Sequence, residues 1–240
     1  MLEKFIKKSN FDAHFHYSEC KNLGICDFPD DFCGISCADS QKSWNVQFNE
    51  IAKNEQNMFI MSAYGLHPQN AKNENVKVSV DFLEELVLKQ KIYFIGEMGF
   101  DFFSDEYKMF SEKQEEIFNL QLDIALKYNM PIVIHCRKAN HKLFEYADKL
   151  SALPEVLFHS FMGTSIEAKS LLNKKINGYF SFGKQIFNGN KKVIDCVKNL
   201  PANRVFAETD APYQFLKGEK YTKPSEITKI FNEITKLQKI

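Results

Sequence analysis

The sequence predicts an α/β protein of the (β/α)8 TIM-barrel class. Eight short apolar segments alternate with segments of helical periodicity, the pattern expected of a parallel sheet covered by helices. The 240 residues suit one such barrel, and no linker or repeat divides them, so we expect a single domain over residues 1–240. An open doubly wound sheet is the alternative, which the lack of a glycine-rich phosphate loop after the first strand disfavours.

The first expected strand, residues 11–17, carries an unusual polar face. Side chains alternate along a strand, so each face receives every second residue. We expect one face to be formed by Asp12, His14 and His16, and the other by Phe11, Ala13, Phe15 and Tyr17. Two imidazoles on one strand face can turn toward a single ion, although a pair of surface histidines on an edge strand is the alternative.

The remaining strands are expected where short apolar runs end in polar or glycine-containing segments. Residues 58–64 are almost continuously apolar, which favours burial on both faces of the strand. The seven further strands are predicted at residues 33–38, 58–64, 92–95, 131–134, 155–158, 178–182 and 204–207.

Helices are expected where apolar residues recur at intervals of three and four. Residues 18–31 are polar and are broken by Gly24 and Pro29, so we expect no full crossover helix there. We expect Ser225 to cap the last helix. The predicted helices are residues 44–54, 80–91, 105–129, 141–150, 165–173, 191–200 and 225–237.

The balance of charges and the absence of long apolar segments limit the partners that we expect for this chain. Lysine and arginine total 31, as do aspartate and glutamate, whereas proteins that coat nucleic acid carry a basic excess. Any nucleic-acid contact should therefore be local, as for an enzyme that handles one end. The chain has no apolar run of membrane-spanning length and no apolar signal region near Met1, so we expect no membrane partner and a cytoplasmic location. No obligatory protein partner is evident.

The six cysteines do not form a recognisable metal motif. No Cys-x-x-Cys occurs, and the spacing of Cys20, Cys26, Cys33 and Cys37 does not fit the usual structural zinc sites. We expect reduced, mostly buried thiols.

Histidines and acids gather where the expected strands end. Active sites of barrels of this class are built at the carboxyl ends of the strands. The first expected strand carries His14 and His16, and the fourth, fifth, sixth and eighth strands end in Glu97, His135, His159 and Asp210. Imidazole and carboxylate are ligands of Zn²⁺, Mn²⁺ or Mg²⁺. Six are more than one open tetrahedral site requires, and they suit two ions about 3.5–4 Å apart that share a carboxylate.

At this point the sequence resembles the TatD family of metal-dependent hydrolases, a group of amidohydrolase-like barrels. The motifs occur in the family's order and span nearly the whole chain. They are Asp12-Ala-His14-Phe-His16, Gly65-Leu-His67-Pro68, Gly96-Glu97-Met-Gly99-Phe-Asp101, Pro131-Ile-Val-Ile-His135-Cys-Arg137, His159-Ser-Phe161-Met-Gly163, Gly178-Tyr-Phe-Ser181 and Glu208-Thr-Asp210-Ala-Pro212. The short segment after the first strand and Phe100 depart from the family's pattern.

The resemblance implies a metal ligand set and an activity. One divalent ion (Mg²⁺, Mn²⁺ or Zn²⁺) would be held by His14, His16, Glu97 and Asp210, and a second by Glu97, His135 and His159, with Glu97 as the bridge. The implied activity is that of a deoxyribonuclease acting on DNA ends, often at the 3′ end. We expect Asp210, together with Glu97, to take part in catalysis by orienting or deprotonating the attacking water.

Four further residues are candidates with a second interpretation each. His67 either contacts substrate or an ordered water, or bonds the backbone. Arg137 either grips a phosphate with its planar guanidinium or forms a surface salt bridge. Asp101 either supports the metal site or forms a turn. Glu208 either supports the metal site or pairs with a lysine.

Two other functions stay open at this stage. The same site could hydrolyse a carbon–nitrogen or carboxyl-ester bond, although the subgroup with a carbamylated bridging lysine would need lysine where Glu97 stands. A non-catalytic metal-binding scaffold is the third possibility, and a missing ligand would have been its signature.

Overall fold

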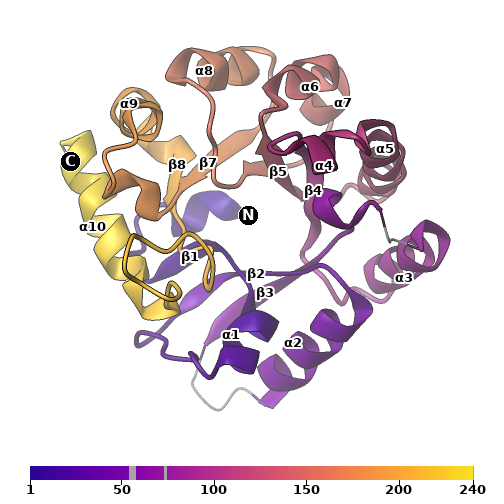
Figure 1. Ribbon diagram of the computed structural model, residues 1–240, viewed down its shortest axis with the longest axis horizontal. Coiled ribbons are helices and arrows are strands. Elements are labelled where there is room, and N and C mark those ends of the chain that lie inside the picture. Colours follow the sequence, from indigo (N-terminus) through magenta and orange to yellow (C-terminus); the bar gives the residue numbers. More distant parts are fainter. Residues whose placement is uncertain (54–57, 73–74, 240) are drawn as a thin grey trace.

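Eight parallel strands follow one another around a barrel axis, with helices on the outside (Figure 1). The computed structural model describes residues 1–53, 58–72 and 75–239. Each strand pairs with the next in chain order, which confirms the predicted barrel class. The strands are β1 (Phe11–Phe15), β2 (Cys33–Ala38), β3 (Phe59–Tyr64), β4 (Phe94–Asp101), β5 (Ile132–Arg137), β6 (Val156–Phe158), β7 (Gly178–Phe182) and β8 (Val205–Ala207).

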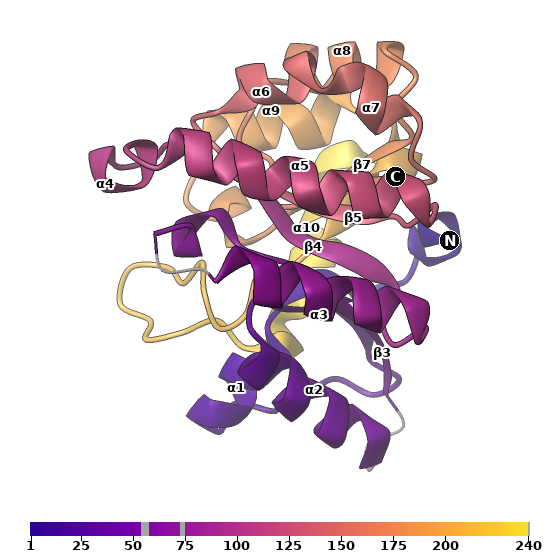
Figure 2. The ribbon, with the colours of Figure 1, turned by 90° about the vertical axis from the view of Figure 1, so that its right-hand side faces the viewer.

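Helices connect successive strands and cover the outside of the barrel (Figures 1 and 2). The α-helices are α1 (Tyr17–Leu23), α2 (Gln41–Lys53), α3 (Val76–Leu88), α4 (Asp105–Lys108), α5 (Ser111–Lys127), α6 (Asn140–Glu145), α7 (Ala147–Ser151), α8 (Ser165–Asn173), α9 (Lys191–Asn199) and α10 (Ile227–Gln238). Short 3-10 turns are η1 (Leu2–Phe5), η2 (Pro68–Asn70), η3 (Lys184–Ile186), η4 (Ala202–Arg204) and η5 (Pro224–Glu226).

Contacts between β8 and β1 bring the two ends of the sheet together. The His16 amide donates to the Ala211 carbonyl at 2.8 Å, and the Asp210 amide donates to the His14 carbonyl at 2.9 Å. The buried Asp12 carboxylate accepts hydrogen bonds from the amide and the hydroxyl of Thr209 at 2.9 and 2.5 Å. The Asp12 side chain thus forms part of the connection between β1 and the end of β8 that backbone hydrogen bonds would form in a regular sheet.

The apolar core has two layers. The inner layer draws residues from all eight strands, which places it inside the barrel, and η1 adds Leu2 and Phe5 to it at the amino end. Its strand residues are Phe11, Ala13, Cys33, Ile35, Cys37, Met61, Ala63, Phe94, Val133, Leu157, Tyr179 and Phe206. The outer layer lies between the strands and the helices. Figure 2 shows η1 at the opposite end of the barrel from α4 and the long segment after β8.

The predicted two-faced strand at residues 11–17 is wrong in one respect. Phe11 and Ala13 belong to the inner layer, but Phe15 and Tyr17 pack in the outer one. The register of β1 against β2 shifts between Asp12 and Phe15, which reverses the alternation. The strand ends at Phe15, and His16 stands in extended conformation directly before α1.

Several predicted helix bounds were wrong. The pattern over residues 105–129 forms two helices, α4 and α5, and that over 141–150 is divided between α6 and α7. α2 begins three residues before the predicted start at Trp44, and Asn54 lies outside the described residues. α3 spans Val76–Leu88 instead of 80–91. Ser225 does not cap α10, because it lies in η5 and its hydroxyl donates to Asp27.

Two strands extend beyond their predicted ends. β4 was expected to stop at Ile95 and β5 at Ile134, yet they run to Asp101 and Arg137. Glu97, Asp101, His135 and Arg137 therefore lie within β4 and β5, although the register of the two strands shifts between Ile95 and Met98, next to Glu97. The segment after β1 holds only the seven-residue α1, in agreement with the expected lack of a full crossover helix.

The six cysteines are free thiols, and all but the half-buried Cys26 are buried, as predicted. Among the described helices, none combines the length and the apolar character that crossing a membrane requires.

We predict that Asp12→Ala lowers the free energy of unfolding by about 2–3 kcal/mol, because buried donors of Thr209 lose their acceptor. Urea unfolding followed by circular dichroism measures the change. The matched control is Asp123→Ala, whose carboxylate is mostly exposed, and it should change stability by less than about 0.5 kcal/mol. Equal stability of Asp12→Ala and the wild type would show that this contact does not hold the barrel closed.

Candidate metal centre

The buried carboxylate of Glu97 lies between two groups of histidines. Glu97 is 3% exposed and projects from β4 at the carboxyl end of the barrel. Its Oε2 atom faces His14 and His16, and its Oε1 atom faces His67, His135 and His159. One acid therefore contributes an oxygen to each of two donor sets.

The first donor set joins β1 to the end of β8. The Nε2 atoms of His14 and His16 lie 3.2 Å apart. They lie 3.4 and 3.3 Å from Oδ1 of Asp210, and 3.2 and 3.6 Å from Oε2 of Glu97. The predicted group of His14, His16, Glu97 and Asp210 is thus assembled in space.

The second donor set comes from β5, from the end of β6 and from the segment after β3. His135 Nδ1 and His159 Nε2 lie 3.3 Å apart, and each lies 2.8 Å from Oε1 of Glu97. His67 joins them, with Nε2 3.3 Å from both Oε1 of Glu97 and Nδ1 of His135. For His67 we expected either contact with substrate or an ordered water, or a bond to the backbone. Its Nδ1 accepts from the Gln69 amide at 3.2 Å, and the position of its Nε2 adds it to the candidate ligands.

Two glycines let β4 approach β5 closely enough to set these distances. A Cβ atom on Gly96 would lie 2.5 Å from the Val133 carbonyl oxygen, and one on Gly99 would lie 2.0 Å from the His135 carbonyl oxygen. Both glycines have φ values, 148° and 142°, that other residues rarely adopt. The Gly-Glu-Met-Gly run is therefore what allows Glu97 and His135 to meet.

Hydrogen bonds on the far side of two rings fix which nitrogen faces the centre. His16 Nδ1 donates to the Cys37 carbonyl at 3.2 Å, which leaves the lone pair on Nε2. His135 Nε2 donates to Oδ2 of Asp101 at 3.0 Å, which leaves the lone pair on Nδ1. In the neutral rings these lone pairs point at Glu97 and its neighbours, as metal ligation requires.

The spacing of the donor atoms fits bound cations. Two ligands about 2.1 Å from one ion, with a bond angle between 90° and 110°, lie about 3.0–3.5 Å from each other. The separations within each set are mostly of this size. Three overlapping groups have donor atoms within 4.8 Å of one another: His14, His159 and Asp210; His14, His16 and Glu97; His67, Glu97 and His135.

Electrostatics in the metal-free centre follow from burial and from mutual attraction. Burial alone would raise the pKa of Glu97, but attraction to the surrounding imidazoles, that of His159 above all, holds it well below its ordinary value. Burial opposes a charge on His16, yet the Asp210 carboxylate raises its pKa from 6.5 to about 9. The pKa of His159 is also raised, because Glu97 and Glu208 outweigh burial. In the metal-free centre, protons on His16 and His159 therefore supply positive charge that bound cations would otherwise supply.

Asp101 and Glu208 lie behind two of the candidate ligands, and Asp101 is hydrogen-bonded to one of them, His135. Asp101 lies within β4, and its Oδ2 atom also accepts a hydrogen bond from Gln69 at 2.8 Å. Burial would raise its pKa, but the bonds from His135 and Gln69 lower it to about 2. Glu208 Oε2 accepts from the Ser181 hydroxyl at 2.6 Å and lies 3.6 Å from Nδ1 of His159.

Sequence reasoning missed Gln214, which orients Asp210. Its Nε2 atom donates to Oδ2 of Asp210 at 2.8 Å, to Ser160 at 2.8 Å and to Glu208 at 3.2 Å. This leaves Oδ1 of Asp210 facing the histidines. Gln214 stands in an irregular segment after β8, where no periodicity signals a role, and only its distance of four residues from Asp210 could have pointed to it.

The donor sets open into a cavity of about 680 Å³ at the carboxyl end of the barrel. Its wall includes Arg137, whose side chain is 40% exposed and lies 3.8 Å from Oδ2 of Asp101. Tyr213 forms part of the opposite lining, with its ring 5.1 Å from that of His16. A ligand in this cavity can reach both the donor sets and a guanidinium group.

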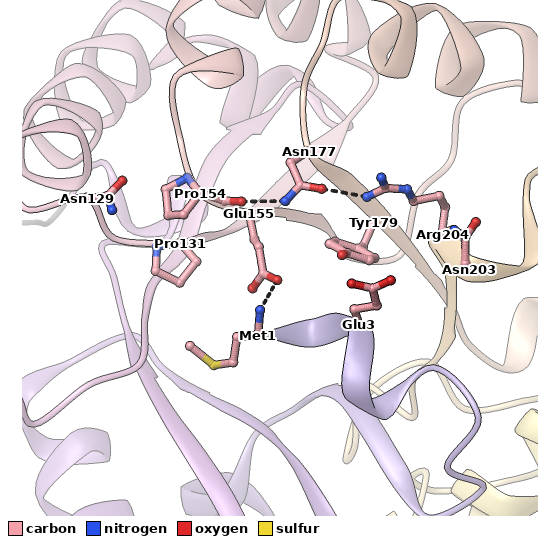
Figure 3. A pocket seen from close by; sticks show the side chains of 10 residues that line it. All are labelled: Met1, Glu3, Asn129, Pro131, Pro154, Glu155, Asn177, Tyr179, Asn203 and Arg204. Atoms are coloured by element: carbon pink, nitrogen blue, oxygen red, sulfur yellow. Dashed lines mark hydrogen bonds and ion pairs between the residues drawn. The ribbon is translucent and has the colours of Figure 1, made fainter.

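A second cavity, of about 440 Å³, lies at the amino end of the barrel (Figure 3). Its polar groups largely satisfy one another. The amino group of Met1 pairs with Glu155, and Arg204 donates to Asn177 at 2.7 Å, as the dashed lines show. The two imidazole–carboxylate donor sets are absent from its lining, so the first cavity is the better candidate site.

Comparison with known proteins agrees with this geometry. Residues 11–240 match the family model for TatD-related DNases. An uncharacterized metal-dependent hydrolase of Bacillus subtilis is 30% identical over 76% of this chain and 71% of its own length. A 3′–5′ ssDNA/RNA exonuclease of Pantoea ananatis is 29% identical over 70% of this chain and 63% of its own.

Among solved structures, the fold is similar to that of a TatD homologue from Escherichia coli. The TM-score is 0.79 at 23% identity, over 95% of this chain and 90% of the other. An uncharacterized amidohydrolase from Saccharomyces cerevisiae gives a TM-score of 0.74 at 15% identity, over 95% and 94%. At these identities the likeness concerns the fold.

We predict that loading the metal-free protein with Zn²⁺ or Mn²⁺ releases protons, and that apparent affinity rises with pH. His16, with a pKa of about 9, is protonated at pH 7 and must lose its proton before its lone pair can bind an ion. Each displaced proton makes the affinity rise about tenfold per pH unit below that pKa. Calorimetry at pH 7 in two buffers of different ionisation enthalpy counts the protons.

The control for that measurement is His141→Ala, which removes a histidine outside both donor sets and should release the same number of protons. A proton count of zero at pH 7 would contradict the assignment of His16 as a ligand.

We predict that Asp101→Asn lowers metal affinity by about 10- to 100-fold, because the neutral amide holds the His135 ring less firmly. Metal titration followed by calorimetry measures the loss. Asp105→Asn, a neighbouring substitution on α4, is the matched control and should leave affinity unchanged. Similar affinities for the two variants would assign Asp101 to the turn alone.

Proposed function

The chain belongs to the family of TatD-related DNases, which are metal-dependent hydrolases, and from that premise we propose that it is a deoxyribonuclease that removes nucleotides from the 3′ ends of single-stranded DNA. The observation that carries the proposal is the position of Glu97, with one carboxylate oxygen in each donor set. This is the arrangement that a pair of ions sharing a carboxylate requires.

We assign the first ion to His14, His16, Glu97 and Asp210, and the second to Glu97, His135 and His159, with His67 as a further ligand. Each set mixes imidazole nitrogen and carboxylate oxygen, which suits Zn²⁺ or Mn²⁺ and tolerates Mg²⁺. When bound, two such ions lower the pKa of an attacking water and neutralise charge on a phosphodiester.

The residues of the chain have separate tasks in that reaction. We assign to Oδ1 of Asp210 the acceptance of the proton of the attacking water, while Gln214 holds its other oxygen. Arg137 can bind a phosphate oxygen through its guanidinium N–H groups. Asp101 holds the His135 ring by a hydrogen bond in the orientation that ligation needs, and the Glu208 carboxylate lies 3.6 Å from Nδ1 of His159, where its charge favours the imidazole.

The names of relatives support a nucleic-acid substrate at the level of the family. The Pantoea relative is named a 3′–5′ ssDNA/RNA exonuclease, and a human relative, 25% identical over 88% of this chain, is named a 3′–5′ RNA nuclease. The aligned part makes up 63% and 29% of those proteins, so the substrate is part of the proposal.

The alternative functions are less well supported. Hydrolysis of a carbon–nitrogen bond by the lysine-bridged type of centre does not fit, because the bridging position holds Glu97. A non-catalytic scaffold does not require five of the six predicted ligands to line one cavity together with Arg137, with the sixth, His14, buried in contact with them.

We predict that the metal-loaded protein shortens 5′-labelled single-stranded DNA from its 3′ end, and that Glu97→Gln lowers kcat at least about 100-fold, because one oxygen and the bridging charge are lost. Gel analysis of the labelled products gives direction and rate, and a chelator should stop the reaction. His135→Ala should be similarly inactive.

The matched control is Glu115→Gln on α5, which neutralises a glutamate outside the cavity and should keep full activity. Retained cleavage by Glu97→Gln, at equal metal content, would refute the two-ion proposal. No release of nucleotides by the loaded wild type would refute the nuclease.

A further inference from the structure

Phe103 is an aromatic side chain that neither the core nor the donor sets use. It follows β4 directly and is 50% exposed. Two cations lie over its ring: the Arg137 guanidinium carbon is 4.1 Å from the ring centroid, and the Lys138 ammonium is 4.5 Å from it. Exposing an apolar ring to water is unfavourable. A half-exposed ring that two cations hold in place is therefore a candidate for a binding role.

The backbone of Phe103 is held in place as well. Its amide donates to Oδ1 of Asp101 at 2.9 Å, and its carbonyl accepts from the Lys138 ammonium at 3.2 Å. Asp101 is buried and is bonded to His135. The ring is therefore fixed relative to the second donor set through a single intervening residue.

The ring also lies beside the cavity. Arg137 lines the cavity and stacks on Phe103, so the aromatic ring continues the wall outward from the guanidinium group. Stacking uses the face of a guanidinium and leaves its N–H groups free in the plane to bind phosphate oxygens. Across the barrel axis, the segment after β8 carries Tyr213, which is 49% exposed and also lines the cavity (Figure 1).

We propose that Phe103, with Arg137 and Lys138, forms a platform on which an unpaired nucleobase of the substrate strand stacks next to the phosphate that Arg137 binds. The proposal rests on the proposed function and adds the residue on which an unpaired base of the single strand would stack. Stacking on an aromatic side chain accepts any base, because every base has a flat face. A base within a duplex offers no free face, so the platform selects frayed or single-stranded ends.

The neutral net charge of the chain agrees with this form of recognition. Without a general basic excess, long-range attraction contributes little to affinity, and local contacts must supply it. The Phe103 ring would offer a flat face to a base once the exposed Lys138 ammonium moves off it, and Arg137 offers N–H donors for a phosphate.

The test compares Phe103→Leu with the wild type on oligothymidylate and on the same oligonucleotide with abasic sites in its last three positions. Leucine keeps apolar bulk but has no aromatic face. With base-containing DNA, Phe103→Leu should raise KM about 5- to 100-fold and leave kcat within about twofold. With abasic DNA the wild type should already show the raised KM, and the substitution should add little.

Binding is measured independently of cleavage by fluorescence anisotropy, with a labelled phosphorothioate oligothymidylate that is bound but cut slowly. Phe103→Leu should weaken it by the same factor, and Phe103→Trp should restore it. The matched control is Phe59→Leu, a phenylalanine that is 45% exposed at the start of β3, far from the cavity mouth, and it should bind like the wild type.

The outcomes separate this inference from the proposed function. Equal binding of base-containing DNA by Phe103→Leu and the wild type, or an equal rise in KM on abasic DNA, would overturn the platform while cleavage by the wild type still stands. Base-dependent binding through Phe103 in a protein that releases no nucleotides would support the platform and refute the nuclease.

Discussion

The structure depends on keeping the ionised carboxylate of Glu97 inside the barrel mouth. An isolated charge at a position only 3% exposed would be strongly unfavourable. Five imidazoles contact its two oxygens and offset that cost, either as protonated rings or as ligands of shared cations. Because burial favours loss of charge from both partners, neither the acid nor the histidines would be stable there alone. The charged groups of the centre therefore depend on one another for their stability.

The barrel supplies what that unit requires, which is precise backbone placement from distant parts of the chain. Glu97 and His135 lie in neighbouring strands whose approach needs Gly96 and Gly99. His14 and Asp210 are set by the contacts that join β1 to β8, in which the Asp210 amide bonds the His14 carbonyl. The contacts that close the sheet also position the first donor set, so a loss of closure would also separate these candidate ligands.

Much of this could be predicted from the sequence, because barrel topology converts positions after apolar strands into neighbours in space. His14, Glu97, His159 and the rest converge for that reason alone. What could not be predicted depends on single backbone events. The register shift in β1 turns Phe15 outward, and nothing in the alternation of residues 11–17 reveals it. Gln214 acts from an irregular segment, where side-chain direction follows from tertiary contacts. His67 was recognised from its motif, but its distance to Glu97 depends on how the chain turns after β3.

The acidic lining of the cavity favours binding of cations before binding of a phosphodiester. Its lining includes the carboxylates of Glu19, Asp39, Glu97 and Asp210, against the Arg137 guanidinium and the rings of His16 and His159, whose pKa values are raised. In the cation-free cavity a phosphodiester would meet these acids, whose charge the guanidinium and the protonated rings offset only in part. Burial raises the pKa of Glu19, yet Asp210 and Glu97 stay ionised, because neighbouring histidines hold their pKa values low. Cations bound at the two donor sets would reverse the sign of the field near Glu97, and only then would Arg137 and the ions attract the same phosphate. On the proposed function, occupation by metal would thus favour substrate binding as well as the chemical step.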